Sequence, residues 1–116
     1  MARPYPISVH KFGGTSVKDL ERIRAVVDVV LSQSDGTRPV VVVSAMAGVT
    51  DLLVKAVEDA RTYDPPCDML DTIEGRYRAV AENLDVTLEI RDELYRGLAE
   101  TMGRLQERLI VLAGVA

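Results

Sequence analysis

The sequence is poor in several residue types that define whole classes of site. Its 116 residues include no tryptophan, one phenylalanine, one cysteine and one histidine. The core must therefore be aliphatic, and a multi-histidine metal site is excluded because it needs more than one imidazole. Cys67 cannot form a disulfide within the chain, which favours a reducing, cytoplasmic environment. We interpret Cys67 as a residue without a functional role.

Long apolar runs and excess positive charge are also missing. No apolar stretch approaches the roughly 20 residues that a membrane span requires, and the N-terminus lacks the basic and then apolar segments of a signal peptide. The formal net charge is −4, whereas a general nucleic-acid surface is basic. We therefore expect neither a membrane nor a nucleic acid among the partners. The composition is that of a soluble globular protein, and the length allows one domain at most.

The most informative segment is the run Lys11-Phe12-Gly13-Gly14-Thr15-Ser16-Val17. It follows the apolar stretch 7–10 and precedes a segment with helical periodicity, so the order is strand, glycine turn, helix. Adjacent glycines let the backbone approach a ligand closely, and a helix start offers free N–H groups that suit phosphate. Lys11 adds a mobile positive charge. On its own, the glycine pair is equally compatible with an ordinary tight turn.

The first half of the chain is predicted to form a parallel βαβ unit. The stretch 7–10 is the first strand, and a helix runs from about Val17 to Gln33 with Ser16 as its N-cap. Val40 to Val43 is an unbroken β-branched run, which indicates a strand covered on both faces, as in a parallel sheet. The helix has one apolar stripe, formed by Leu20, Ile23, Val27, Val30 and Leu31.

The rest of the chain has the pattern of helices. Thr50 is predicted to cap a second helix that runs to about Thr62, and Asp64-Pro65-Pro66 stops it. Two further apolar stripes predict a helical hairpin whose join lies near Asp85-Val86-Thr87. The inward residues are Leu53, Ala56, Val57 and Ala60 in the second helix, then Leu70, Ile73, Tyr77, Val80 and Leu84, and finally Leu94, Leu98, Met102, Leu105, Leu109 and Leu112.

Two segments carry a resemblance to a known family. The glycine run near the N-terminus is similar to the opening signature of aspartokinases, which are amino-acid kinases. The segment Val40-Val41-Val42-Val43-Ser44-Ala45-Met46-Ala47-Gly48-Val49-Thr50-Asp51 resembles the strand and loop that hold their amino-acid substrate. The resemblance implies an α/β, amino-acid-kinase-like three-layer fold with a parallel βαβ start, truncated here and followed by a helical segment. We interpret 1–116 as the N-terminal portion of such a catalytic domain, with a βαβα nucleotide/substrate half-site at 1–64 and a helical hairpin at 65–116.

The resemblance also implies an activity and a set of site residues. The expected reaction is phosphorylation of the L-aspartate side chain by MgATP to 4-phospho-L-aspartate, the entry step to lysine, threonine and methionine synthesis. ATP phosphates would be contacted by Lys11, Phe12, Gly13 and Gly14, with Lys11 as the catalytic cation. Mg²⁺ would arrive with the nucleotide, not in a protein metal site. The remaining assignments are hydroxyl contacts from Thr15 and Ser16 and aspartate contacts from Ser44 and Thr50.

Alternatives remain open for the residues and for the function. Thr50 and Ser16 also suit helix capping, and Ser44 also suits a hydrogen bond within its own loop. The chain could be a non-catalytic fragment that binds a partner, or a kinase for glutamate or acetylglutamate. Because two strands do not form a stable sheet on their own, we expect activity to need the missing C-terminal part of the domain or a homo-oligomer.

Overall fold

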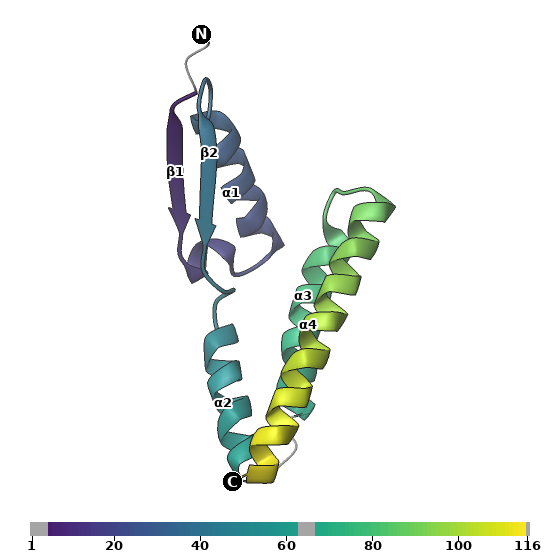
Figure 1. The fold of residues 1–116 in the computed structure, drawn as a ribbon. Helices are drawn as coiled ribbons and strands as arrows, with labels where there is room; N and C mark the ends of the chain where they lie inside the picture. The colour runs from purple at the N-terminus through teal and green to yellow at the C-terminus, as the bar shows by residue number, and fades with distance from the viewer. Residues whose placement is uncertain (1–4, 63–66, 116) are drawn as a thin grey trace. The chain divides into compact units, whose positions relative to one another are not determined.

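The computed structural model describes residues 5–62 and 67–115 (Figure 1). The chain divides into two compact units, Met1–Gly48 and Val49–Ala116. Whereas the sequence suggests a division near residues 64 and 65, the second helix groups with the helices that follow it, because it packs against both. The elements are β1 (Ile7–Phe12), the 3-10 helix η1 (Gly14–Val17), α1 (Leu20–Gln33), β2 (Arg38–Val43), α2 (Val49–Arg61), α3 (Cys67–Asn83) and α4 (Leu88–Val115).

The first unit is a parallel βαβ unit, as predicted. Strands β1 and β2 pair in parallel, and their register runs from Ile7 opposite Arg38 to Phe12 opposite Val43. Each strand is longer than its apolar run, because Lys11 and Phe12 extend β1 and residues 38–39 extend β2. Both strands therefore end at the same edge of the sheet, where the glycine run begins.

The start of α1 differs from the prediction. A short 3-10 helix, η1, comes first, and Ser16 lies inside it with its N–H bonded to the Gly13 carbonyl at 3.0 Å. The N-cap of α1 is Asp19, which has an extended backbone and whose carboxylate accepts the Arg22 N–H at 2.9 Å. Ser16 is therefore not the cap, since a carboxylate three residues later performs that role.

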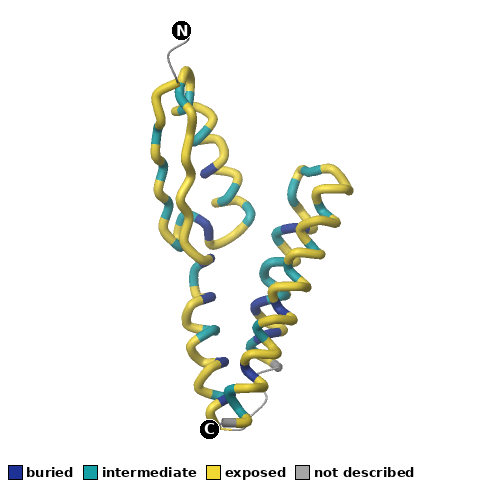
Figure 2. Tube along the Cα trace, in the orientation of Figure 1, coloured by how far each residue is buried: buried dark blue, intermediate teal, exposed yellow. Residues whose placement is uncertain are grey.

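The sheet is covered less completely than its valine run suggests. Side chains on β1 alternate, with Ser8, His10 and Phe12 half-buried and the others exposed. The four valines of β2, residues 40–43, remain 44–55% exposed (Figure 2). The described residues of this unit contain one α-helix, α1, beside the two strands. Helices therefore do not cover both faces of the sheet in this part of the chain, contrary to the prediction. Two predicted stripe residues of α1, Val27 and Leu31, are likewise exposed.

The second unit is built from α2, α3 and α4, and the predicted hairpin is confirmed. The helices α3 and α4 meet across the predicted join at residues 85–87. Ala56 and Ala60 of α2 are almost completely buried, because their small side chains let the helix approach its neighbours closely. Val57 and Leu94 are exposed, contrary to the prediction. The other buried residues of this unit are Val49, Leu70, Ile73, Ala81, Met102 and Leu109. No helix in the described ranges is both long and apolar enough to cross a membrane.

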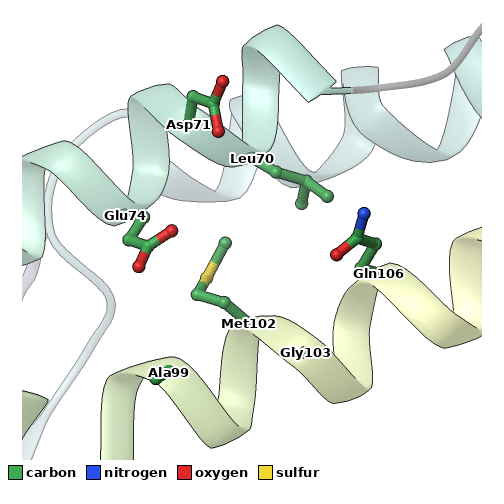
Figure 3. A pocket seen from close by; sticks show the side chains of 7 residues that line it. All are labelled: Leu70, Asp71, Glu74, Ala99, Met102, Gly103 and Gln106. Carbon is green, nitrogen blue, oxygen red and sulfur yellow. The ribbon is translucent and has the colours of Figure 1, made fainter. Parts of the chain in front are cut away.

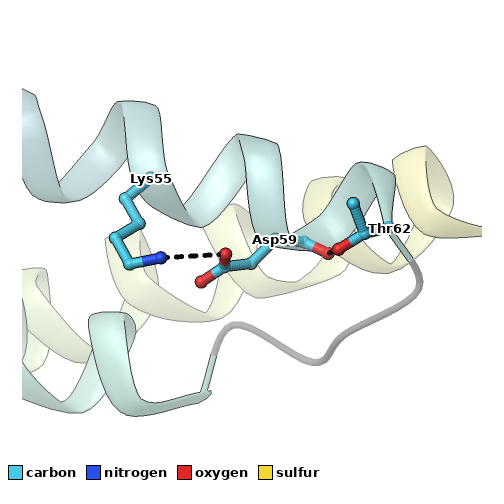
Figure 4. Close-up of polar contacts among 3 residues, drawn as sticks. All are labelled: Lys55, Asp59 and Thr62. Atoms are coloured by element: carbon cyan, nitrogen blue, oxygen red, sulfur yellow. Dashed lines mark hydrogen bonds and ion pairs between the residues drawn. The ribbon is translucent and has the colours of Figure 1, made fainter.

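The end of α2 is fixed by hydrogen bonds to one residue. The Thr62 hydroxyl donates to the Asp59 carbonyl at 2.8 Å, and the Lys55 ammonium contacts the Asp59 carboxylate at 3.1 Å (Figure 4). Such an exposed pair contributes about 0.3–0.5 kcal/mol. The predicted stop at Asp64-Pro65-Pro66 lies outside the described residues.

Arg91 connects α4 to the end of α3. Its Nε donates to the Ala81 carbonyl at 3.2 Å, and an Nη donates to the Leu84 carbonyl at 2.8 Å. Carbonyls at a helix C-terminus have no partner within the helix. We expect Arg91→Met to lower the free energy of unfolding by about 1–3 kcal/mol in urea denaturation, because hydrogen bonds from a charged group are lost.

The matched control for this prediction is Arg96→Met, at an exposed position of the same helix. It should change the free energy of unfolding by less than about 0.5 kcal/mol. Equal destabilisation by the two substitutions would show that the Arg91 hydrogen bonds do not hold the end of α3.

Candidate functional site

Two loops leave the carboxyl edge of the sheet side by side. The Ser44 N–H donates to the Phe12 carbonyl at 3.1 Å, one step beyond the last pair of the strand ladder. The glycine run after β1 and the 44–48 loop after β2 therefore begin at the same point. Ligands of open α/β sheets bind beyond the carboxyl ends of the strands, so this edge is the candidate site.

The two adjacent glycines have different surroundings. A Cβ atom built on Gly14 would lie 3.1 Å from the Ala45 carbonyl oxygen, 3.5 Å from the Ser44 hydroxyl and 3.7 Å from the Ala47 Cα. A Cβ atom on Gly13 would meet no atom within 4 Å. Gly14 is therefore packed against the 44–48 loop, whereas Gly13 has open space beside it where a phosphate could lie.

The other predicted site residues of the first unit flank the two glycines or lie in the 44–48 loop, and most are exposed to solvent. Lys11 and Thr15 are exposed, and Phe12 and Ser16 are half-buried. Lys11 lies on the exposed side of β1, one residue before the strand ends. The Ser44 hydroxyl is exposed and donates to the Ala45 carbonyl at 3.3 Å. In this conformation the Ser44 hydroxyl makes a hydrogen bond within its own loop, which was the alternative to a contact with substrate.

Thr50 belongs to the second unit and is not an N-cap. Helix α2 begins at Val49, so Thr50 lies within its first turn. Gly48, with φ of 83°, comes immediately before the helix. Glycine adopts a positive φ without steric cost. The chain therefore turns at Gly48, and helix α2 begins at Val49, one residue before Thr50. The role of Thr50 in aspartate binding stays a prediction.

The loop contacts include residues that sequence reasoning did not single out. The Ala45 carbonyl and the Ala47 Cα form the wall against which Gly14 packs. Their small size, in the run Ala45-Met46-Ala47-Gly48, is the signal that could have indicated a close approach of two backbones.

His10 has a structural environment. Its Nε2 lies 3.1 Å from the Ser8 hydroxyl and 3.5 Å from the Ser34 hydroxyl, and Ser8 also bonds to Thr37 at 2.9 Å. These contacts join β1 to the segment between α1 and β2. The interpretation of His10 as a strand residue with polar partners is confirmed.

The helical unit has concavities of its own. One, of about 230 Å³, lies between α3 and α4, and its lining includes Leu70, Asp71, Glu74, Met102 and Gln106 (Figure 3). The Arg78 guanidinium forms an ion pair with the Glu74 carboxylate at 3.0 Å. A larger apolar groove of about 500 Å³ is bordered by Leu53, Ile73, Tyr77 and Leu98. Within residues 5–62 and 67–115, no three His, Cys, Asp or Glu side chains gather in a way that could hold a metal ion.

Comparison with known proteins identifies relatives of this chain. The profile of the amino acid kinase family matches residues 6–113. A bifunctional aspartokinase/homoserine dehydrogenase of Daucus carota is 40% identical over 106 residues, which cover 90% of this chain and 10% of the relative. The chain thus corresponds to a small part of that protein.

Solved structures agree with the sequence matches. Escherichia coli aspartokinase III in complex with lysine and aspartate has a TM-score of 0.68 at 34% identity, covering 91% of this chain and 23% of that one. The same enzyme in complex with aspartate and ADP has a TM-score of 0.62 at 34% identity, covering 93% and 26%. The α/β fold predicted from the sequence is therefore confirmed, over about a quarter of the length of the solved enzyme. With the family profile extending over nearly all of its residues, the chain belongs to the amino acid kinase family.

Proposed function

We propose that this chain supplies the phosphate-contacting loop and an aspartate-contacting loop of an aspartate kinase. The observation that carries the proposal is the juxtaposition of the Gly13-Gly14 run with the 44–48 loop at one sheet edge. The relatives are aspartokinases, and one solved relative holds both aspartate and ADP. The lysine, threonine and methionine pathways would then begin with this reaction.

The proposed reaction is transfer of one phosphoryl group between oxygens. A side-chain carboxylate oxygen of aspartate attacks the γ-phosphorus of ATP, and the bond from that phosphorus to the β–γ bridging oxygen breaks. ADP leaves with the electron pair of that bond, and the product is the acyl phosphate 4-phospho-L-aspartate. Such a transfer depends mainly on positioning and on positive charge around the phosphoryl group.

Each loop residue has a role suited to that requirement. The exposed ammonium of Lys11 supplies positive charge at the strand end, and the open side of Gly13 gives the phosphates access to the backbone. Phe12, Thr15 and Ser16 complete the phosphate loop. Ser44 and Thr50 are proposed to contact aspartate, which requires the Ser44 hydroxyl to leave its bond to Ala45. Mg²⁺ is proposed to enter as part of the nucleotide.

The direct test is formation of an acyl phosphate, trapped as the hydroxamate, with MgATP and a panel of aspartate, glutamate and acetylglutamate. When the domain is completed by its C-terminal part or by a homo-oligomer, we expect product from aspartate and none from glutamate or acetylglutamate. A product with glutamate or acetylglutamate would assign the chain to another amino-acid kinase. A folded chain that binds neither MgATP nor aspartate would contradict the proposal and favour a partner-binding fragment.

Substitution of the two hydroxyl residues should affect aspartate selectively. We expect Ser44→Ala and Thr50→Val each to raise the KM for aspartate about tenfold, the cost of about one hydrogen bond to a charged group, with little change in the KM for ATP. Ser32→Ala, at an exposed serine of α1 that bonds to the Val29 carbonyl, is the control. An unchanged KM for aspartate in either variant would remove that residue from the site.

A further inference from the structure

A side chain on Gly14 would make a tight contact with the neighbouring loop. A Cβ atom there would approach the Ala45 carbonyl oxygen to 3.1 Å, which is tighter than an ordinary van der Waals contact. The obstacle is backbone, so no side chain can rotate away to make room. One of the two loops would have to move by a few tenths of an ångström.

The requirement for glycine at this position comes from space and not from backbone conformation. Among the described glycines, positive φ angles occur at Gly36 and Gly48, and Gly14 is not among them. Alanine at position 14 would therefore adopt the existing backbone angles without strain. The atoms nearest to its methyl group would all belong to the 44–48 loop, so the substitution tests the spacing of the two loops.

The neighbouring glycine provides a contrast within the same turn. Gly13 has φ of −79° and ψ of 177°, an extended conformation that any residue adopts, and a Cβ atom there meets nothing within 4 Å. A methyl group at Gly13 would project into the open space proposed for phosphate. It would leave the 44–48 loop where it is.

We propose that Gly14 is a positioning residue that sets the distance between the phosphate loop and the 44–48 loop. The strand ladder and the Ser44-to-Phe12 hydrogen bond fix the two loops along the strand direction. The contact of Gly14 with Ala45 fixes how closely they approach each other. Given the proposed function, on which this role in catalysis rests, Gly14 aligns the γ-phosphate of ATP with the carboxylate of aspartate.

Misalignment of reactants affects the rate more than it affects binding. A displacement of about 1 Å can cost on the order of a hundredfold in rate. Alanine at position 14 keeps the backbone N–H that is expected to contact phosphate, and its displacement of the loop is smaller than about 1 Å. We therefore expect Gly14→Ala to lower kcat about tenfold while the KM for ATP stays within about twofold. Gly13→Ala should instead raise the KM for ATP, because its methyl group occupies space beside the phosphates.

The experiment compares the full chain with its Gly14→Ala and Gly13→Ala variants by amide NMR and by the hydroxamate assay. In the absence of ligand, Gly14→Ala should move the amide signals of residues 45–47, and Gly13→Ala should leave them in place. Thermal unfolding of all three proteins identifies any general loss of stability. A merely structural role for Gly14 would lower the melting temperature without separating kcat from KM.

The outcomes separate this proposal from the proposed function. Unmoved signals for residues 45–47 in Gly14→Ala, or the same kcat and KM changes in both variants, would overturn the positioning role. A wild-type chain that forms no acyl phosphate would count against activity of the chain alone. The amide comparison, which needs no activity, would still decide whether Gly14 sets the spacing of the two loops.

Discussion

Lys11→Ala is expected to weaken MgATP binding at least about tenfold and to abolish aspartate-dependent hydroxamate formation. Lys11 is exposed, one residue before the end of β1, and Gly13, with open space beside it, follows two residues later. A charged hydrogen bond contributes about 1.5–3 kcal/mol, and about 1.4 kcal/mol corresponds to a tenfold change in affinity. The loss in rate should be larger still, because negative charge on the transferring phosphoryl group must be stabilised as it moves.

Calorimetric titration with MgATP measures the binding part of this prediction. The matched control is Lys55→Ala, which removes an exposed lysine of α2 whose ion pair with Asp59 is a surface contact. It should leave MgATP affinity unchanged. Equal affinity in wild type and Lys11→Ala would exclude Lys11 from the phosphate site, whatever the activity of the protein.

Ile73→Ala is expected to destabilise the protein more than Arg91→Met or any substitution on the surface. The Ile73 side chain is 3% exposed in the helical unit, where it lies in α3 beside the apolar groove. Truncation of a buried isoleucine removes its contacts and leaves a cavity, which typically costs about 2–5 kcal/mol. Urea denaturation followed by circular dichroism should show this as a lower midpoint with an unchanged slope.

The same substitution at an exposed site separates packing from helix propensity. Ile110 lies in α4 and is 62% exposed, so Ile110→Ala should change the free energy of unfolding by less than about 0.5 kcal/mol. Similar losses in the two variants would mean that Ile73 is not part of a packed core.

The βαβ unit and the helical hairpin could be predicted because their signals are local. The β-branched run 40–43 and the apolar stripes of α3 and α4 each need one segment of sequence to be recognised. The glycine run is equally local, since it combines two glycines with a preceding lysine. The position of both loops at one sheet edge follows from the parallel pairing that this pattern implies.

Features that depend on competition between neighbouring residues could not be predicted in the same way. Ser16 and Asp19 are both good N-cap residues, and sequence alone does not rank them, but only Asp19 caps α1 in the fold. Thr50 is not at the cap position, because Gly48 adopts a positive φ and the helix begins before the threonine. Helical periodicity also predicts an inward Val27, although the helix buries a narrower face.

The contact between Gly14 and Ala45 depends on tertiary structure. It requires the register of β1 and β2 and the conformations of two loops that are about thirty residues apart in sequence. The sequence indicates that both loops are built from small residues. It does not indicate which glycine faces the neighbouring loop and which faces open space.

The most direct test of a nucleotide site at this edge is amide NMR of the chain during titration with MgATP. We predict saturable movement of the signals of residues 12–16 in the wild-type chain, and loss of that movement in Lys11→Ala. If a folded chain shows no movement of these signals at millimolar MgATP, or if the signals that move belong instead to the groove of the helical unit, the glycine run is not a phosphate site.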